Sequence, residues 1–285
     1  MTRPANPLSK CTMPFDLQQI ELPFQMRPDL RRLGADAVHL HALAPASPLF
    51  HEKRQVSRAA QALHVAPGFD AGPAIAAIWH QARLDGIAVP ATPAPPLELV
   101  LQQDLAVLDL ASARVPWMCI CVPSGWAPEE KIGLGLAAIH APVADSAALN
   151  PRWNPLARLL TAGGSWERNV WTISPSSRFD QHPGRHVPAP WSSASDPEDF
   201  ARQCWLRSER QTFFPVRDGQ GQPMGQAVFT ITVALQPLTE AVRNVADALR
   251  LQQALASMSD AVLAYKRLTA ARAPLLSWLS QRAMH

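Results

Sequence analysis

The sequence predicts an α+β protein, and three stretches carry that prediction. Val115 to Val122 is apolar on both faces of an extended chain, which is typical of a buried strand. Within Gln211 to Leu235, the segment AVFTITVAL alternates two sets of side chains, and the polar stretch Asp218 to Gly225 supplies the turn of a β-hairpin. Beyond residue 235 the apolar spacing is helical, so the chain combines strands and helices.

Prolines divide the part of the chain that precedes this core. Residues 1–50 carry short apolar pieces without sustained periodicity, and we expect an extended wrap that packs onto the core. Glu52 to Gln81 has helical spacing, interrupted at Pro67 to Pro73. Leu97 to Leu110 fits a strand or a helix equally well, and it is separated from the helical part by prolines 90, 93, 95 and 96.

We expect a single domain, although a chain of 285 residues also admits two small ones. Its parts are an N-terminal wrapping and helical segment (1–96), a sheet core (97–235) and C-terminal helices (236–285). In the last part, Ser257-x-x-Asp260 is a capping box for one helix, and Pro274 opens another.

Composition limits the classes of function. The net charge is only +3 and the basic residues are scattered, so nucleic-acid binding has little support. No apolar run approaches the ~20 residues that span a bilayer. The N-terminus lacks the apolar segment of a secretory signal, and we expect a soluble cytoplasmic protein. The four cysteines, at 11, 119, 121 and 204, lack CxxC spacing and are expected to be reduced.

Pro123 to Pro142, PSGWAPEEKIGLGLAAIHAP, holds the most interesting candidate residue. Pro128 followed by two glutamates predicts the start of a helix, and Pro142 predicts its end near His140. His140 lies on the apolar side of that helix, where an imidazole must bind a ligand, form hydrogen bonds or remain unsatisfied. The residues alone favour a hydrogen-bonded core histidine.

Other candidate sites are weaker. Ser124 lacks the GxSxG context of a nucleophile, and the GxGxxA pattern from Gly133 falls inside the predicted helix instead of before it. His182 and His186 have the spacing of metal ligands but no obvious third partner. The strand beginning RSERQ can line a polar pocket or form an ion pair at a strand edge.

Four segments, in order, resemble one family, typified by the haem-binding α subunit of a haem-dependent oxidative N-demethylase. They are PFQMRPDL (Pro23–Leu30), PSGWAPEEKIGLGLAAIHAPV (Pro123–Val143), RSERQTF (Arg207–Phe213) followed by AVFTITVALQPL, and SMSDAVLAYKRL. The resemblance covers most of the chain. Two departures are the long turn RDGQGQPMG and the strand end TVAL, where the family carries an arginine, and they weaken the expectation of an identical substrate.

The resemblance implies a PAS-like fold, a mixed antiparallel sheet flanked by helices that holds haem b. The family enzyme is a monooxygenase-type oxidoreductase that uses oxygen to oxidise an N-methyl group of dimethylamine, a small amine. The resulting carbinolamine releases formaldehyde. Electrons come from separate reductase subunits that carry flavin and an iron–sulfur cluster, and this chain has no motif for either carrier.

The resemblance also suggests roles for individual residues. His140 is the first candidate for the iron ligand, with its other ring nitrogen held by a carbonyl or carboxylate, and His182 is the reserve candidate. Glu209 and Arg210 are the candidate catalytic residues, since a carboxylate binds an ammonium group. The other candidates for contacts with the cofactor are Arg207, Gln211 and Lys131.

Two alternatives remain open. One is a PAS-like sensor that binds haem or another small ligand without turnover, and the other is a structural partner that has lost haem. For the tryptophan-rich middle of the chain, which includes residues 153, 166, 171 and 191, we expect core packing rather than a pocket lining.

Overall fold

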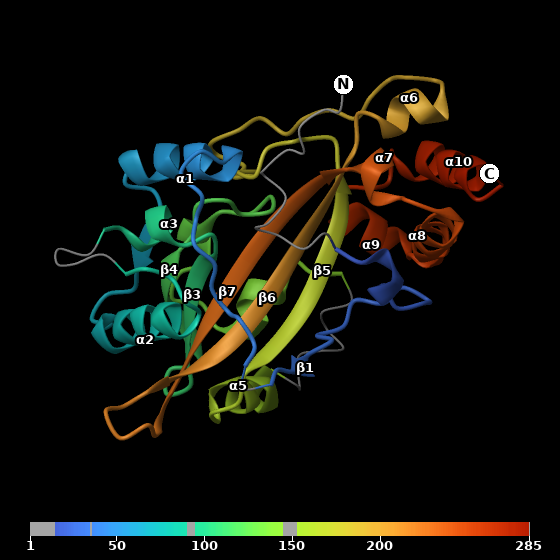
Figure 1. The fold of residues 1–285 in the computed structure, drawn as a ribbon. Coiled ribbons are helices and arrows are strands. Elements are labelled where there is room, and N and C mark those ends of the chain that lie inside the picture. Colours follow the sequence, from blue (N-terminus) through green and yellow to red (C-terminus); the bar gives the residue numbers. More distant parts are fainter. Residues whose placement is uncertain (1–14, 35, 90–94, 145–152, 285) are drawn as a thin grey trace.

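The fold is built around one antiparallel sheet (Figure 1). The computed structural model describes residues 15–34, 36–89, 95–144 and 153–284. Within them, seven strands pair in the order β1-β5-β6-β7-β3-β4-β2, and every neighbouring pair is antiparallel. Helices flank this sheet, which confirms the predicted α+β class. Cys11 and prolines 90 and 93 lie outside the described residues.

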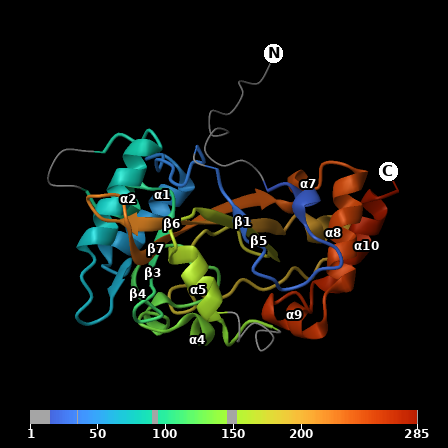
Figure 2. The ribbon, with the colours of Figure 1, turned by 90° about the horizontal axis from the view of Figure 1, so that it is seen from below.

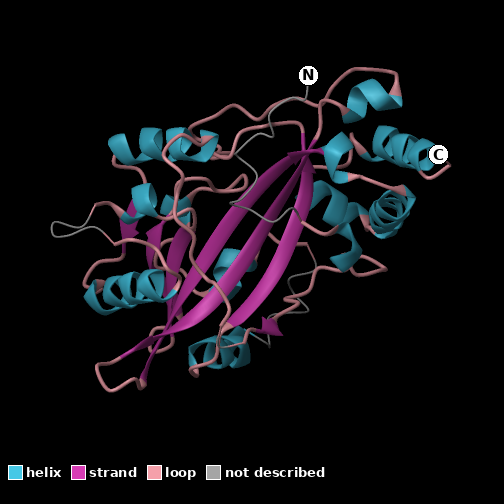
Figure 3. Ribbon diagram, in the orientation of Figure 1, coloured by secondary structure: helices cyan, strands magenta, loops and turns pink. Residues whose placement is uncertain are grey.

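The three longest strands, β5, β6 and β7, lie side by side in the sheet (Figure 3). In chain order the strands are β1 (Arg31–Arg32), β2 (Leu63–Val65), β3 (Asp104–Asp109), β4 (Arg114–Cys119), β5 (Trp166–Ser174), β6 (Trp205–Arg217) and β7 (Pro223–Pro237).

The helices are short, and no helix in the described part of the chain could cross a membrane. They are η2 (Leu17–Gln19), α1 (Pro48–Arg58), α2 (Gly72–Leu84), α3 (Leu97–Val100), η3 (Pro128–Glu130), α4 (Leu136–His140), α5 (Trp153–Thr161), α6 (Pro197–Ala201), α7 (Leu238–Ala241), α8 (Val245–Ser257), α9 (Asp260–Tyr265) and α10 (Arg272–Arg282).

The predicted hairpin is confirmed and is longer than expected, because β6 begins at Trp205. Its turn is closed by the Asp218 carboxylate, which accepts hydrogen bonds from the backbone N–H groups of Gln220 and Gln222. Gly221 has φ +79°, a conformation that favours glycine. The turn predicted for Asp218 to Gly225 is therefore closed by a side-chain carboxylate and by a glycine in a left-handed conformation.

The two faces of the sheet are covered by different helices. The first face carries the odd-numbered residues of β6, and there α1 and α5 pack with Met118 and Ile231. The second face carries the even-numbered residues, and there α2 packs with Trp117 and Val228. Figure 2 shows α4 and α5 on one side of the sheet and the C-terminal helices at one end.

The C-terminal helices and the N-terminal wrap form a core of their own. Leu17 of η2 is fully buried against α8 and α10, whose largest buried side chain is Trp278. Ser259, not Ser257, caps α9, since its hydroxyl accepts a hydrogen bond from the N–H of Val262. The predicted capping box is wrong because the Ser257 hydroxyl instead donates within α8, to Gln253 O at 2.8 Å.

The predicted helix from Pro128 to His140 is wrong in its middle. Only η3 and α4 are helical, and between them the chain runs beside β4: Gly133 N donates to Val115 O, and Val115 N donates to Leu134 O. Gly133 has φ +74°, which no ordinary helix contains. The two glycines of this stretch thus mark a strand-like return rather than a helix.

Two other expectations need correction. Glu52 to Gln81 contains the edge strand β2 as well as α1 and α2, because Leu63 and Val65 pair with β4. The ambiguous Leu97 to Leu110 is both a short helix, α3, and a strand, β3. Trp153 and Trp171 are core residues as expected, whereas Trp166 and Trp191 are only half-buried, and the cysteines at 119, 121 and 204 are free and buried.

A buried ion pair joins α1 to β3. The Lys53 ammonium is fully buried, lies 3.1 Å from Asp104 Oδ1 and donates to the carbonyl oxygens of Leu101 and Gln103. The second oxygen of Asp104 accepts a hydrogen bond from Val122 N at 2.7 Å. This pair therefore fixes the chain just before Ser124.

We expect Lys53→Met to lower the free energy of unfolding by about 3–5 kcal/mol, because it leaves the Asp104 charge buried without its partner. The measurement is urea denaturation. Adding Asp104→Asn should restore much of the loss, since the amide keeps an acceptor for Val122 without the charge. Arg58→Gln, an exposed cation of the same helix, is the control. A loss below 1 kcal/mol for Lys53→Met would contradict the expectation.

Candidate functional site

Side chains from three of the four family-like segments lie around Glu209, which projects from the first face of the sheet. Ser124 follows β4 and donates to a Glu209 oxygen in a short hydrogen bond. Lys266, just after α9, is close enough to Glu209 for their charges to interact, and its ammonium lies 5.1 Å from the ring centre of Phe24. Segments far apart in sequence therefore converge on one half-buried carboxylate.

Neutral donors satisfy both oxygens of Glu209. One oxygen accepts from the Ser124 hydroxyl, and the other accepts from Gln211 Nε2 at 2.6 Å. Gln211 Oε1 in turn accepts from Arg168 Nε, also at 2.6 Å. Glu209 and Gln211 share this face because side chains alternate along β6, and Arg168 is directly opposite Gln211 on β5.

Arg207 has a structural role in the site. It is 1% exposed, and its three nitrogens donate to Ser124 Oγ (2.7 Å), Val122 O (2.9 Å) and Arg178 O (3.3 Å). Burial lowers the pKa of its guanidinium, and the charge of Glu209 works against that shift. With every nitrogen bound, Arg207 holds the Ser124 loop against β6.

Arg210 is not part of this cluster. It points to the second face of the sheet, where its guanidinium Nε lies 2.9 Å from Glu167 and Nη1 donates to Val38 O. The alternation of β6 that brings Glu209 and Gln211 together takes Arg210 away from them. The structure thus separates the two residues that were expected to act together.

Sequence reasoning missed two cations of the cluster, Arg168 and Lys266. Lys266 lay in the matched segment SMSDAVLAYKRL, which could have drawn attention to it. Its ammonium donates to Trp171 O at 2.6 Å, and burial lowers its pKa to about 8, against the opposing effect of Glu209. Arg168 belongs to no motif, and only the pairing of β5 with β6 reveals its position.

His140 lies at the end of α4 with one ring nitrogen occupied. Its Nδ1–H donates to Leu136 O at 2.8 Å, and its ring stacks on Trp153 with centres 4.3 Å apart. Burial lowers the pKa of His140 to about 4, so the imidazole is neutral at pH 7. Among the described residues, Nε2 has no hydrogen-bond partner and keeps its lone pair.

This donor arrangement fits an axial haem ligand. An iron-bound histidine coordinates through one nitrogen of a neutral imidazole while a carbonyl or carboxylate orients the other. Lys131 lies near the ring, with its ammonium 3.4 Å from Ile139 O, and it helps to lower the His140 pKa. His140 therefore has the chemistry and the tautomer that such a ligand needs.

The surroundings of His140 are apolar and closely packed. A cavity of about 160 Å³ lies beside Trp153, lined by Ala113, Gly135, Leu136, Ala137, Asn154 and Ala157. Ligand pockets commonly measure ~300–1,000 Å³. A haem at His140 therefore requires the partly buried apolar side chains nearby, such as Ile139, to move apart.

His182 is already fully engaged. It is 4% exposed, its Nε2–H lies 3.0 and 3.1 Å from the Glu129 oxygens, and its Nδ1 accepts from Gly184 N at 3.0 Å. Because both ring nitrogens are bound, coordination of a metal would break one of these hydrogen bonds. The reserve candidate thus fits a structural role better than a ligand role.

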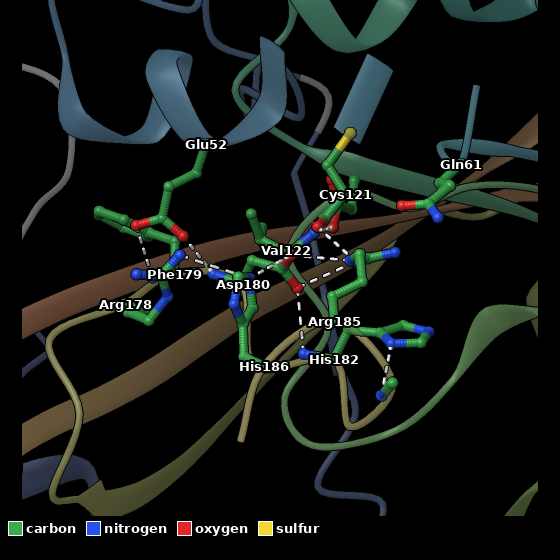
Figure 4. A network of polar contacts seen from close by, with 12 residues as sticks. Glu52, Gln61, Cys121, Val122, Arg178, Phe179, Asp180, His182, Arg185 and His186 are labelled. Carbon is green, nitrogen blue, oxygen red and sulfur yellow. Dashed lines mark hydrogen bonds and ion pairs between the residues drawn. The ribbon is translucent and has the colours of Figure 1, made fainter. Parts of the chain in front are cut away.

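The loop around His182 is held by Asp180 (Figure 4). The Asp180 carboxylate accepts from Arg185 at 2.8 and 2.9 Å and from His186 Nε2 at 3.0 Å, and Arg185 also donates to Cys121 O. No cluster of three metal-ligating side chains occurs among the residues that the structure describes. His182 and His186 therefore belong to a hydrogen-bonded loop that packs on the end of β4.

The free energy of unfolding should fall as the pH drops from 6.5 towards 4. In that range the unfolded chain protonates His140 at its ordinary pKa of 6.5, whereas the folded ring stays neutral down to a pKa of about 4. His140→Gln should lose this part of the pH dependence. A histidine titration followed by NMR on the apoprotein checks the pKa directly, and a value near 6.5 would refute the assignment.

A comparison with protein families supports the resemblance, and three of the four segments fall within the match while Pro23–Leu30 lies outside it. A family model described as haem-dependent oxidative N-demethylase, alpha subunit-like, matches residues 81–276, which is more than half of the chain. The match includes β3 to β7, Glu209, His140 and the C-terminal segment with Lys266. The chain therefore belongs to the haem-dependent oxidative N-demethylase alpha subunit-like family.

Proposed function

We propose that this protein is the haem-binding subunit of an oxygen-dependent N-demethylase that acts on a small amine. The observation that carries the proposal is His140, a neutral imidazole oriented by Leu136 O with Nε2 available, in a chain of this family. A PAS-like haem cavity would lie between the sheet and the segment that contains α4 and α5. When bound, haem b supplies the oxygen chemistry that oxidises an N-methyl group.

The protein's own residues would position the haem and the amine. His140 would hold the iron, and the carbonyl of Leu136 would keep its ring oriented. Glu209 would accept a hydrogen bond from the substrate ammonium if Ser124 or Gln211 released one of its oxygens. Oxidation of the methyl group gives a carbinolamine that breaks down to the smaller amine and formaldehyde. Electrons would come from a separate flavin and iron–sulfur reductase.

A second candidate is a haem or small-ligand sensor without turnover. Glu209 favours it, since each of its carboxylate oxygens already accepts a hydrogen bond from a neutral donor within the protein. Formaldehyde release separates the two candidates, because a sensor binds haem and releases none.

We expect the purified protein to show a Soret band after haem is supplied, and His140→Ala to lose it or shift it strongly. His182→Ala should retain the band of the wild type, with a lower free energy of unfolding because two hydrogen bonds are lost. Titration followed by absorption spectroscopy measures both. The absence of a Soret band in the wild type would refute the proposed function, and its loss in His182→Ala alone would transfer the ligand role.

For turnover, we expect Glu209→Gln to lower kcat/KM for an N-methylamine by about 10- to 100-fold, because a hydrogen bond to a charged group contributes roughly 1.5–3 kcal/mol. The assay follows formaldehyde release with a supplied reductase. Glu130→Gln removes an exposed carboxylate of the neighbouring segment and serves as the control. Equal activity of the two variants would exclude a role for Glu209 in substrate binding.

A further inference from the structure

The outermost strands of the sheet, β1 and β2, expose different side chains. β1 consists of Arg31 and Arg32, and both are exposed. Charges on an edge strand discourage pairing with a strand of another molecule. β2 has the sequence Leu-His-Val, in which Leu63 is 55% and Val65 is 46% exposed. The edge formed by β2 therefore lacks the charges that protect the opposite edge.

Hydrogen bonds to β4 involve every second residue of β2. The Ala62 carbonyl accepts, and the Ala66 N–H donates, a backbone hydrogen bond of 2.8 Å to the chain that contains β4. Because these bonds alternate along an antiparallel pair, His64 also faces β4, whereas Leu63 and Val65 face outward. In the part of the chain that the structure describes, no group forms a hydrogen bond with the outward N–H and carbonyl groups.

The two outward residues also place their side chains on one face of the sheet. Leu63 is opposite Cys119 and Val65 is opposite Trp117, so both side chains lie on the second face. Trp117 and Cys119 are buried in the core beneath α2, whereas their neighbours on β2 are about half exposed. The apolar layer of this face therefore continues to the edge of the sheet, where it meets solvent.

A second copy of β2 has the groups that this edge needs. When two copies pair antiparallel about a twofold axis at His64, Leu63 of each copy lies opposite Val65 of the other. These are the residues with outward backbone groups, so each opposed pair exchanges two hydrogen bonds. The leucine and valine side chains then meet on the same face of the joined sheet.

The segments on either side of β2 carry opposite charges. Arg58 precedes the strand and Asp70 follows it, and both are exposed. Neither forms an ion pair with another described residue. Because paired strands of two copies run antiparallel, the flank with Arg58 in one copy lies on the same side as the flank with Asp70 in the other. The symmetric arrangement therefore opposes unlike charges.

We propose that the β2 edge is a self-association surface, at which two copies of this chain pair their β2 strands about a twofold axis at His64 and join their sheets into one. The paired strands are only three residues long, so the dimer should be weak and reversible, with a dissociation constant in the micromolar range. No residue of this surface belongs to the candidate functional site, and the association does not depend on haem.

Analytical ultracentrifugation of the purified chain, over a series of concentrations around the micromolar range, should show a monomer–dimer equilibrium. Val65→Pro removes an outward N–H but no hydrogen bond within one copy, and an edge strand tolerates proline at such a position. This variant should raise the dissociation constant about tenfold or more, because hydrogen bonds between the copies are lost. Leu63→Lys should also weaken the dimer. The control is Leu84→Lys, which changes an aliphatic side chain of α2 that is 67% exposed and should leave the equilibrium unchanged.

A wild type that remains monomeric at every concentration overturns the proposal and would leave the edge for a strand of a different protein. A dimer that persists unchanged in Val65→Pro and Leu63→Lys, both folded as judged by thermal unfolding, also overturns it, because the contact then lies elsewhere. If these variants do not fold, hydrogen exchange of the wild type decides. Exchange at the Leu63 and Val65 amides that slows as the protein concentration rises supports the proposal, and exchange that is independent of concentration refutes it.

Discussion

Hydrogen bonds hold both the N–H and the carbonyl of Val122, and the rest of the site depends on that constraint. Its N–H donates to Asp104, which the buried Lys53 neutralises, and its carbonyl accepts from the buried guanidinium of Arg207. Two charged side chains, one from β3 and one from β6, thus hold a residue that lies three positions after the end of β4. Ser124 follows two residues later, and its hydroxyl donates to Glu209 while it accepts a hydrogen bond from Arg207 Nε.

The sequence was most informative where the alternation of side chains along a strand decided the structure. The alternation along AVFTITVAL predicted the hairpin, and the same period along β6 puts Glu209 and Gln211 on one face of the sheet. The same alternation points Arg210 to the opposite face of the sheet. The functional hypothesis overlooked this when it grouped Arg210 with Glu209. Arg168 could not be predicted, because its place depends on the register between two strands that are far apart in sequence.

Burial alone would favour His182 over His140 as the candidate ligand. His182 is almost fully buried, yet Glu129 and Gly184 occupy both of its nitrogens, whereas the less buried His140 keeps one free. Sequence pattern cannot show this difference, since it depends on which backbone groups lie nearby. The sequence pattern also predicted a continuous helix before His140, whereas Gly133 lets the chain return along β4. Histidine roles follow from hydrogen bonding rather than from helix periodicity.

Lys266 has a second consequence for the sheet. β1 pairs with only two residues of β5, Trp166 and Glu167, so among the described strands the outer edge of β5 has no partner from Arg168 onwards. A bare strand edge can recruit a strand from another molecule, and a lysine placed on it discourages such pairing. The ammonium of Lys266 occupies the carbonyl of Trp171 on that edge. Lys266 and Phe24, whose ring packs against Trp171, therefore cover this part of β5 and leave it less open to pairing with a strand of another molecule.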